Sequence, residues 1–425
     1  MEEKSPSSKN AKGLSLVLRS PLLWVIVALI AGGIGYDFVR PNLTVDGLYG
    51  QIALQMRKIS AVPPDAKAVE KVFRLCNKIV SRSIDESKKA EAYRMLAGFD
   101  PRTGNLLNKP RMEMLLKAAD CGDSEACATV GKAYMYGRDG LACDPQKAIA
   151  YLERSDADEA KAELGAYYMR QKNYDKAYET LKEYDTECMA VLGVELRFTV
   201  LGLLYYYGLG DVERNPEKAA AFFGLNSIPL TEGRTDIEPE RTDYDDLEAK
   251  RCLCCGNLSL SPTNMGYFSM SDKIDGGGFV PRIYMAHEFF TKAIRLEPET
   301  NLGTLLSILD SFLDMYEEYM RDGVQTKKLL NGLWNDRFLR RTGKTLGTST
   351  SGGYWGELKN GHPDGWGIEC SYNHMESGKI HSVTIGRRKV AYIREKFGWT
   401  AVITGPSVRS EISKDGTTLT VSVVE

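Results

Sequence analysis

The chain has 425 residues, of which 43% are hydrophobic, 26% charged and 9% aromatic, and its formal net charge is −2. This composition is that of a folded globular protein, and the length allows two or three domains. The near-neutral charge excludes a chain that binds nucleic acid mainly through its overall charge. With only four histidines, there is little material for imidazole catalysis or for a histidine-rich metal site.

The first 36 residues predict a single-pass membrane anchor. Residues 20–36, SPLLWVIVALIAGGIGY, form an uncharged run of about 17 residues, the lower limit for a helix that crosses a bilayer. Four basic residues precede this run, whereas only Arg40 lies between it and Arg57. Because positive charge concentrates on the cytoplasmic side, we expect a cytoplasmic tail at residues 1–20 and a transmembrane helix at residues 21–36. The bulk of the chain is then periplasmic or otherwise extracytoplasmic.

Two other interpretations of this run stay open. Ala31, Gly32 and Gly33 are small residues of the kind found near a signal-peptide cleavage site, and cleavage would give a secreted protein. A buried core helix is the other interpretation. Residues 37–60 are expected to form a linker.

A repeat of about 35 residues comes after the linker. Residues 131–152, GKAYMYGRDGLACDPQKAIAYL, align without a gap with residues 202–223, GLLYYYGLGDVERNPEKAAAFF. The offset, 202 − 131, is about 71 residues or two units, and a shorter middle unit begins near residue 165. Glycine, tyrosine, lysine and alanine recur at matching positions: Gly131, Tyr134, Gly137, Lys147 and Ala148; Gly165 and Tyr168; Gly202, Tyr205, Gly208, Lys218 and Ala219.

These recurring residues suit a pair of packed antiparallel helices. A glycine in the first helix lets the second helix approach closely, and the tyrosine one turn later fills the gap between hairpins. Gly137 and Gly208 are expected to end the first helix, because glycine adopts a left-handed conformation without strain. Asp144 and Asn215 then serve as N-caps of the second helix, each followed by a proline.

The pattern LG-x-x-Y-x-x-G-x-G, followed by Asp or Asn, x-x and Lys-Ala, resembles Sel1-like repeats, a looped relative of the tetratricopeptide repeat. The resemblance is clearest over residues 112–224 and departs from the family at residues 138–141, where the usual Gly-x-Gly-Val is stretched. It implies a mainly α fold, in which hairpins stack into an α-solenoid. We assign residues 61–224 to this solenoid.

A long insert and a final repeat are expected next. Residues 225–284 are rich in turn formers and charge, which predicts a long loop or insert. Within it, AKRCLCCGNLSL at residues 249–260 is a candidate first helix of a further hairpin. Residues 285–340 are assigned to the last repeat and to capping helices.

After residue 341 the pattern becomes that of a small all-β domain of about five to seven strands. Its start, GGYWGELKNGHPDGWGIE, resembles a MORN repeat, which is linked to membrane or protein contacts. A hairpin with structural aromatics and glycines is favoured over a lipid-binding one. The matching residues are Tyr354, Gly356, Gly361, Gly365, Trp366 and Gly367.

No catalytic or cofactor-binding residues are predicted. Residues 342–345, TGKT, lack the earlier glycine of a phosphate-binding loop, since position 338 is Phe338. The cluster Cys252, Cys254 and Cys255 has no second cysteine pair at zinc-site spacing, so no metal site is expected. In an oxidising compartment Cys121 and Cys127, which flank a turn between repeats, could form a disulfide.

The sequence therefore predicts a non-enzymatic, membrane-tethered scaffold or adaptor that holds a protein or peptide partner, not nucleic acid, on its solenoid surface. Two alternatives are a hydrolase-like enzyme, with a site in the β domain or the insert, and a structural envelope protein. Asn42-Leu-Thr44 and Asn257-Leu-Ser259 match the N-glycosylation pattern, which only a host that glycosylates lumenal domains would use.

Overall fold

The computed structural model describes most of the chain between residues 44 and 425. The described residues are 44–59, 66–98, 100, 107, 109–186, 195–225, 233–234, 238–262, 279–323, 344–348, 354–360, 362–372, 380–393, 398–413, 415 and 417–425. The anchor expected at residues 21–36 lies outside them. Within the part that is described, no helix combines the length and the apolar character that a bilayer crossing requires.

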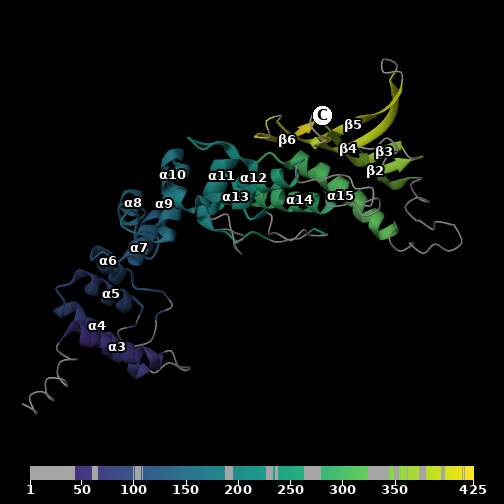
Figure 1. The fold of residues 1–425 in the computed structure, drawn as a ribbon. Coiled ribbons are helices and arrows are strands. Elements are labelled where there is room, and N and C mark those ends of the chain that lie inside the picture. The colour runs from purple at the N-terminus through teal and green to yellow at the C-terminus, as the bar shows by residue number, and fades with distance from the viewer. Residues whose placement is uncertain are drawn as a thin grey trace, which may run out of the picture. The chain divides into compact units, whose positions relative to one another are not determined.

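The chain divides into two compact units, residues 1–161 and 162–425. The described elements of the first unit are helices: α3 Val45–Ile59, α4 Ala66–Arg82, α5 Glu86–Ala97, α6 Met112–Asp120, α7 Ser124–Tyr136 and α8 Pro145–Leu152 (Figure 1). One hydrophobic cluster joins α3, α4 and α5 through residues such as Leu48, Val72 and Ile79. A second joins α6 and α7 around Leu115 and Val130.

The second unit combines helical hairpins with a sheet. Its helices are α9 Asp158–Arg170, which begins at the end of the first unit, α10 Tyr174–Leu181, α11 Leu196–Tyr207, α12 Pro216–Phe222, α13 Asp245–Ser259, α14 Phe279–Leu296 and α15 Gly303–Gly323. A short 3-10 helix, Lys182–Thr186, follows α10.

The sheet is an antiparallel meander in which each strand pairs with the next along the chain. Its strands are β1 Thr345–Thr348, β2 Tyr354–Lys359, β3 His362–Tyr372, β4 Ile380–Ile393, β5 Gly398–Ile412 and β6 Leu419–Val424. The sheet packs on α15, as Figure 1 shows. One hydrophobic core fills this contact and continues into the last hairpin, with Phe290, Phe312 and Trp355 fully buried in it.

This architecture confirms the predicted fold class, helical-hairpin repeats followed by a small all-β domain. Two predicted domain limits differ from the structure. The linker expected at residues 37–60 contains α3, because Leu48 and Ile52 recur at helical spacing and are buried. The insert expected at residues 225–284 contains α13, which covers nearly all of the candidate helix predicted at residues 249–260 and begins four residues before it; its charged first turn continues into buried Cys252, Cys254 and Cys255.

Candidate functional site

In each described hairpin of the repeat, a glycine of the first helix packs directly against a large side chain at the second helix. A β-carbon placed on Gly131 would lie less than 3.0 Å from Leu152, and the same holds for Gly165 against Leu181 and Gly202 against Phe223. The first helix therefore has no room for a side chain where it crosses the second helix. Gly256 of α13 meets Phe290 of α14 in the same way. The pair α13–α14 therefore packs like the earlier hairpins, although residues 260–278 separate its helices.

A lysine of the second helix lies over the tyrosine of the first helix in all three repeats. The ammonium of Lys147 is 5.6 Å from the ring centroid of Tyr134. The corresponding distances are 4.3 Å for Lys176 over Tyr168 and 4.2 Å for Lys218 over Tyr205. Such cation–π contacts explain why lysine recurs at a partly exposed position. The alanine after each lysine, including Ala148 and Ala219, is fully buried.

Capping residues end the first helix and start the second helix at both ends of the loops that follow α7 and α11. Gly137 and Gly208 end α7 and α11 in the left-handed conformation, with φ of 64° at both. Asp144 accepts a hydrogen bond from the backbone N–H of Lys147, and Asn215 accepts one from that of Lys218. These caps bring the aromatic and lysine side chains of each hairpin together on one face.

Tyr206, which has no aromatic counterpart at Met135, joins two hairpins. Its hydroxyl accepts a 3.0 Å hydrogen bond from the side-chain amide of Asn257. Tyr206 is only 3% exposed, and Ser259 is fully buried with its hydroxyl donating to the carbonyl of Cys255. The glycosylation pattern at Asn257-Leu-Ser259 therefore lies within a packed helix, and the folded chain does not present it.

A polar cluster lies at the base of the third hairpin. The carboxylate of Asp185 accepts hydrogen bonds from Tyr178 at 3.0 Å and Tyr205 at 2.9 Å, and it pairs with Lys218 at 2.8 Å. Burial raises the pKa of Asp185, but these three donors outweigh burial, so the pKa is lower than usual. Tyr178, Tyr205 and Lys218 also line a cavity of about 610 Å³ that reaches Asp415 and Thr417 before β6. Because its lysine and its tyrosines are already paired with Asp185, this cluster is suited to stabilising the hairpin.

A buried ion pair within α13 is joined by a lysine of α14. Arg251, 4% exposed, donates to both carboxylate oxygens of Glu248, at 2.7 and 2.6 Å. Lys292 donates to the same carboxylate at 2.8 Å. Burial alone would raise the pKa of Glu248, but the two cations lower it to about 2. Burial raises the pKa of neighbouring Cys255 to about 12, so its thiol stays protonated at neutral pH.

A groove of about 560 Å³ with a largely apolar lining is here called the Tyr207 groove. Its lining combines apolar and cationic side chains from several hairpins: Met169, Arg170, Lys172, Tyr174, Tyr207, Leu209, Ala249, Lys250, Leu253, Glu297 and Thr300. Tyr207 is 40% exposed, an unusual value for a large aromatic side chain in the hairpins. Lys172 and Lys250 are both exposed.

One wall of the Tyr207 groove is fixed by Arg170. Its guanidinium pairs with Asp246 at 2.7 Å, donates to the carbonyl of Asp243 at 2.8 Å and lies over the ring of Tyr244. Tyr244 in turn donates to Glu163 of α9. These contacts neutralise Arg170 and hold α9 against the start of α13. The remaining charges at the groove are Lys172, Lys250 and Glu297, a net excess of one positive charge.

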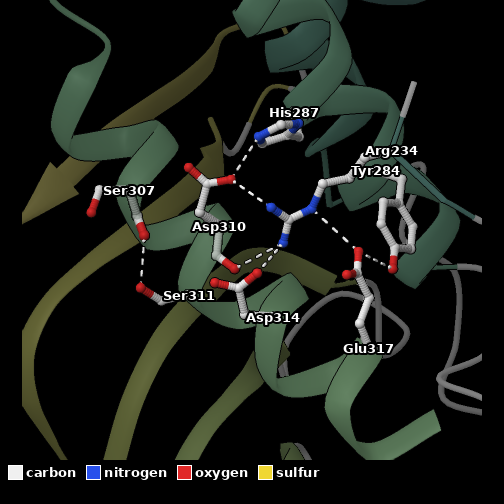
Figure 2. Close-up of polar contacts among 8 residues, drawn as sticks. All are labelled: Arg234, Tyr284, His287, Ser307, Asp310, Ser311, Asp314 and Glu317. Atoms are coloured by element: carbon white, nitrogen blue, oxygen red, sulfur yellow. Dashed lines mark hydrogen bonds and ion pairs between the residues drawn. The ribbon is translucent and has the colours of Figure 1, made fainter. Parts of the chain in front are cut away.

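Another polar cluster surrounds Arg234, which lies between α12 and α13 in the sequence. Figure 2 shows its guanidinium pointing between Asp310, Asp314 and Glu317 of α15. Tyr284 and His287 of α14 contact two of the same carboxylates. No sequence pattern marks this cluster, because Arg234 and the carboxylates that it pairs with are at least 76 residues apart in the chain.

The predicted cysteine pair has free thiols in the structure. Cys121 is half-buried and Cys127 is buried, and the Cys127 thiol donates to the carbonyl of Ala119 at 3.5 Å. The described residues hold no group of three or more His, Cys, Asp and Glu side chains that could bind a metal ion.

The MORN-like residues form the β2–β3 hairpin, apart from Gly361, which lies outside the described residues. Gly356, Gly367 and Gly386 are directly opposite one another across β2, β3 and β4. Tyr354 lies over this row, less than 3.0 Å from a β-carbon placed on Gly367, and its hydroxyl donates to the carbonyl of Trp366 at 3.1 Å. Gly356 and Gly367 thus make room for a buried tyrosine, whereas a β-carbon on Gly386 would meet Ser407.

Two further MORN-like residues lie beside Glu357. The backbone N–H of Trp366 donates to its carboxylate at 2.7 Å. A β-carbon placed on Gly365 would collide with the same carboxylate. The hairpin therefore uses these positions to seat an acidic side chain that is 8% exposed.

Comparisons with known proteins agree with the geometry of the hairpins. The family model described as Sel1 repeat matches residues 124–155 and 200–225, which are the α7–α8 and α11–α12 hairpins. The chain contains Sel1 repeats. The unmatched α9–α10 hairpin between these two Sel1 repeats has the same glycine and lysine–tyrosine contacts, with a shorter loop.

Two solved structures have low similarity to the chain. The first is c5321, a protective antigen of uropathogenic Escherichia coli strains that displays an SLR fold, at 13% identity and a TM-score of 0.31. The alignment covers 64% of this chain and 66%, just under two thirds, of that one. The second is a Sel1 repeat protein from Oxalobacter formigenes, at 12% identity and a TM-score of 0.26, covering 65% of this chain and 90% of that one. No curated protein matches the chain.

Proposed function

We propose that this protein is a non-enzymatic scaffold that binds a segment of a partner protein in the Tyr207 groove. The observation that carries the proposal is an exposed aromatic side chain with apolar neighbours, held between hairpins of a Sel1-repeat array. Stacked hairpins offer extended surfaces to peptides, and exposed tyrosines are common at the centres of protein interfaces.

The composition of the groove indicates the kind of segment. Leu209 and Leu253 are half-buried beside Tyr207, and together they suit an apolar or aromatic side chain. Lys172 and Lys250 are exposed on the rim, so a carboxylate next to that side chain would find a cation within reach. We therefore expect an acidic segment that carries an apolar anchor.

The scaffold is proposed to be tethered to a membrane by residues 21–36, with the repeats on the extracytoplasmic side. The uncharged run and the basic residues before it support this part of the proposal. The MORN-like hairpin is proposed to be structural, because Tyr354 and Glu357 fill the space that its glycines leave.

The test places a photo-crosslinking residue in the groove of the full chain in its native membranes. Benzoylphenylalanine replaces Tyr174, which lines the groove, or in a matched control Tyr167, an α9 tyrosine outside it. A discrete adduct is expected only at position 174. It should be lost in Tyr207→Ala and weakened in Lys172→Glu with Lys250→Glu. An adduct of equal yield at both positions, or one unaffected by these changes, would contradict the proposal.

A further inference from the structure

The outer face of α4 carries a row of cationic side chains, here called the basic stripe. Its five members are spaced four, three, four and four residues apart, so they lie on one side of the helix. The helix contains one carboxylate, Glu70, which is 60% exposed and lies 3.7 Å from Arg74. α4 therefore has a net excess of four positive charges, although the net charge of the whole chain is −2. The stripe consists of exposed Lys67, Lys71, Arg74, Lys78 and Arg82.

The opposite face of α4 is used inside the protein. Val69, Val72 and Ile79 are buried in the hydrophobic cluster that α4 shares with α3 and α5. The helix is therefore not available to bind another surface by burying its apolar face. An outside partner of α4 meets the basic stripe, and charge complementarity requires that partner to be anionic.

An isoleucine projects from the end of the same helix. Ile84 lies between α4 and α5, two residues after Arg82, and at 95% it is the most exposed large hydrophobic side chain among the described residues. The two acidic residues that follow it have roles of their own, since Asp85 caps α5 and Glu86 pairs with Lys89 at 2.7 Å. Transfer of the isoleucine from water to an apolar phase is favourable. The basic stripe thus ends in an apolar tip.

Cations beside an exposed apolar side chain fit the surface of an anionic bilayer. Lysine and arginine pair with lipid phosphates, and an isoleucine next to them can enter the boundary between headgroups and acyl chains. A nucleic-acid backbone would pair with the cations but would offer Ile84 no hydrocarbon phase. We propose that the basic stripe and Ile84 form a docking surface for a membrane that contains anionic phospholipid.

This docking surface goes beyond the proposed scaffold function. It is separate from the Tyr207 groove, and it does not require that residues 21–36 span the bilayer. Where those residues do anchor the chain, α4 begins only 30 residues beyond them, between residue 36 and residue 66, and is within reach of the same membrane. The stripe then holds the first helices against the headgroups and limits how the anchored chain is oriented.

The test adds the full chain to lipid nanodiscs of phosphatidylcholine alone or of phosphatidylcholine mixed with anionic phosphatidylglycerol. The environment-sensitive fluorescent amino acid Anap replaces Ile84 or, as a control position, Thr129, which is exposed on α7. At position 84 the emission should shift to the blue and be quenched by brominated acyl chains, but only in discs that contain phosphatidylglycerol. At position 129 neither change is expected.

Lys71→Gln with Lys78→Gln should lose most of the shift at position 84, because each cation near an anionic surface contributes to binding. Lys359→Gln with Lys389→Gln is the matched control. It removes the same charge from exposed lysines of the sheet and should keep the shift. The proposal is overturned if position 84 stays in water in both kinds of disc, if it shifts equally in both, or if the two lysine pairs behave alike.

The same preparation separates this proposal from two others. If position 84 shows no shift, and a labelled DNA duplex binds the chain but not Lys71→Gln with Lys78→Gln, the stripe is a nucleic-acid site instead. Retention of the chain by discs of phosphatidylcholine alone reports on the anchor at residues 21–36. A chain that stays out of those discs has no anchor, but the basic stripe should still recruit it to the anionic ones.

Discussion

The side-chain amide of Asn257 donates a 3.0 Å hydrogen bond to the hydroxyl of Tyr206, and this bond joins α11 of one hairpin to α13 of the next. Tyr206 is the middle one of three consecutive tyrosines, residues 205–207, and its position has no aromatic residue in the other Sel1 repeat. Its ring also lies under the guanidinium of Arg214, which donates to the carbonyl of Leu419 in β6. One buried tyrosine thus contacts the next hairpin and, through Arg214, the sheet.

Tyr206→Phe is expected to destabilise the second unit by about 0.5–1.5 kcal/mol, because it removes this bond and leaves the amide of Asn257 without its acceptor. The measurement is the urea unfolding midpoint, with hydrogen exchange of α11 and α13. Tyr174→Phe serves as the control and should leave both unchanged. In a double-mutant cycle, Asn257→Ala should cost little more once Tyr206 is phenylalanine. Fully additive effects would show that the bond contributes nothing.

Gly202→Ala is expected to destabilise the second unit by about 1–3 kcal/mol, because the added methyl would overlap the ring of Phe223. Gly303→Ala is the opposite case. No atom lies within 4 Å of a β-carbon placed there, so alanine should be neutral or stabilise α15 by up to about 1 kcal/mol. The thermal unfolding midpoints of the two variants measure these effects: the midpoint should fall where the glycine is needed for close packing and should stay or rise where it only adds backbone freedom. If the Gly202→Ala chain were as stable as the unaltered one, the two helices could move apart to accept the methyl group without loss of stability, and the prediction would be wrong.

The sequence alone was sufficient to predict the helical hairpins whose residues recur at a fixed spacing. Gly131 and Gly202, with Tyr134 and Tyr205, are separated by a fixed offset, and one physical role explains each pair. The α13–α14 hairpin was harder to predict, since its connection is long and Ser259 stands where the repeat has its tyrosine, three residues after Gly256. Its one shared signal is Gly256, which lies opposite a phenylalanine, as Gly202 does.

The sites themselves depend on contacts between distant parts of the chain. Arg234 meets α15 across 76 residues, and no local periodicity marks such a pair. The Tyr207 groove likewise takes residues from α9, α11, α13 and the turn after α14. Sequence patterns indicate which face of a helix is apolar, but they do not indicate which exposed side chains meet once hairpins of unequal loop length stack.

The buried pair of Glu248 and Arg251 predicts a loss of stability in acid. The pKa of Glu248 is about 2 in the folded chain against an ordinary value of 4.5. A lowered pKa means that the unfolded chain binds the proton more readily. The contribution of this group is therefore fully present above about pH 4.5 and is lost as the pH falls towards 2. Urea midpoints between pH 7 and pH 2.5 measure this loss.

Glu248→Gln should remove the part of the acid sensitivity that comes from this carboxylate. At pH 7 it should also destabilise the second unit by about 3–5 kcal/mol, since Arg251 would stay buried without its counter-charge. Glu299→Gln, at an exposed position, is the control and should match the unaltered chain at every pH. If Glu248→Gln followed the same pH profile as the control, the carboxylate would not be the titrating group.

The recurring lysine offers a comparison between repeats. Lys218 pairs with Asp185 at 2.8 Å, donates to the hydroxyl of Tyr205 at 2.8 Å and lies over its ring, with 30% of its side chain exposed. Lys147 occupies the same repeat position but is 62% exposed, and its nearest carboxylate, Asp144, is 3.4 Å away. Because exposure and distance weaken ion pairs, the two lysines should contribute unequally to stability.

Lys218→Met keeps the apolar stem and removes the charge. It is expected to cost about 1–3 kcal/mol, because Asp185 loses its cation while it still accepts from two tyrosines. Lys147→Met should cost less than about 1 kcal/mol. Hydrogen exchange measures each hairpin separately, so the loss of protection should appear in α11 and α12 for Lys218→Met. Equal losses in the two variants would show that the ring contact shared by both lysines, and not the pairing with Asp185, determines the contribution of this position.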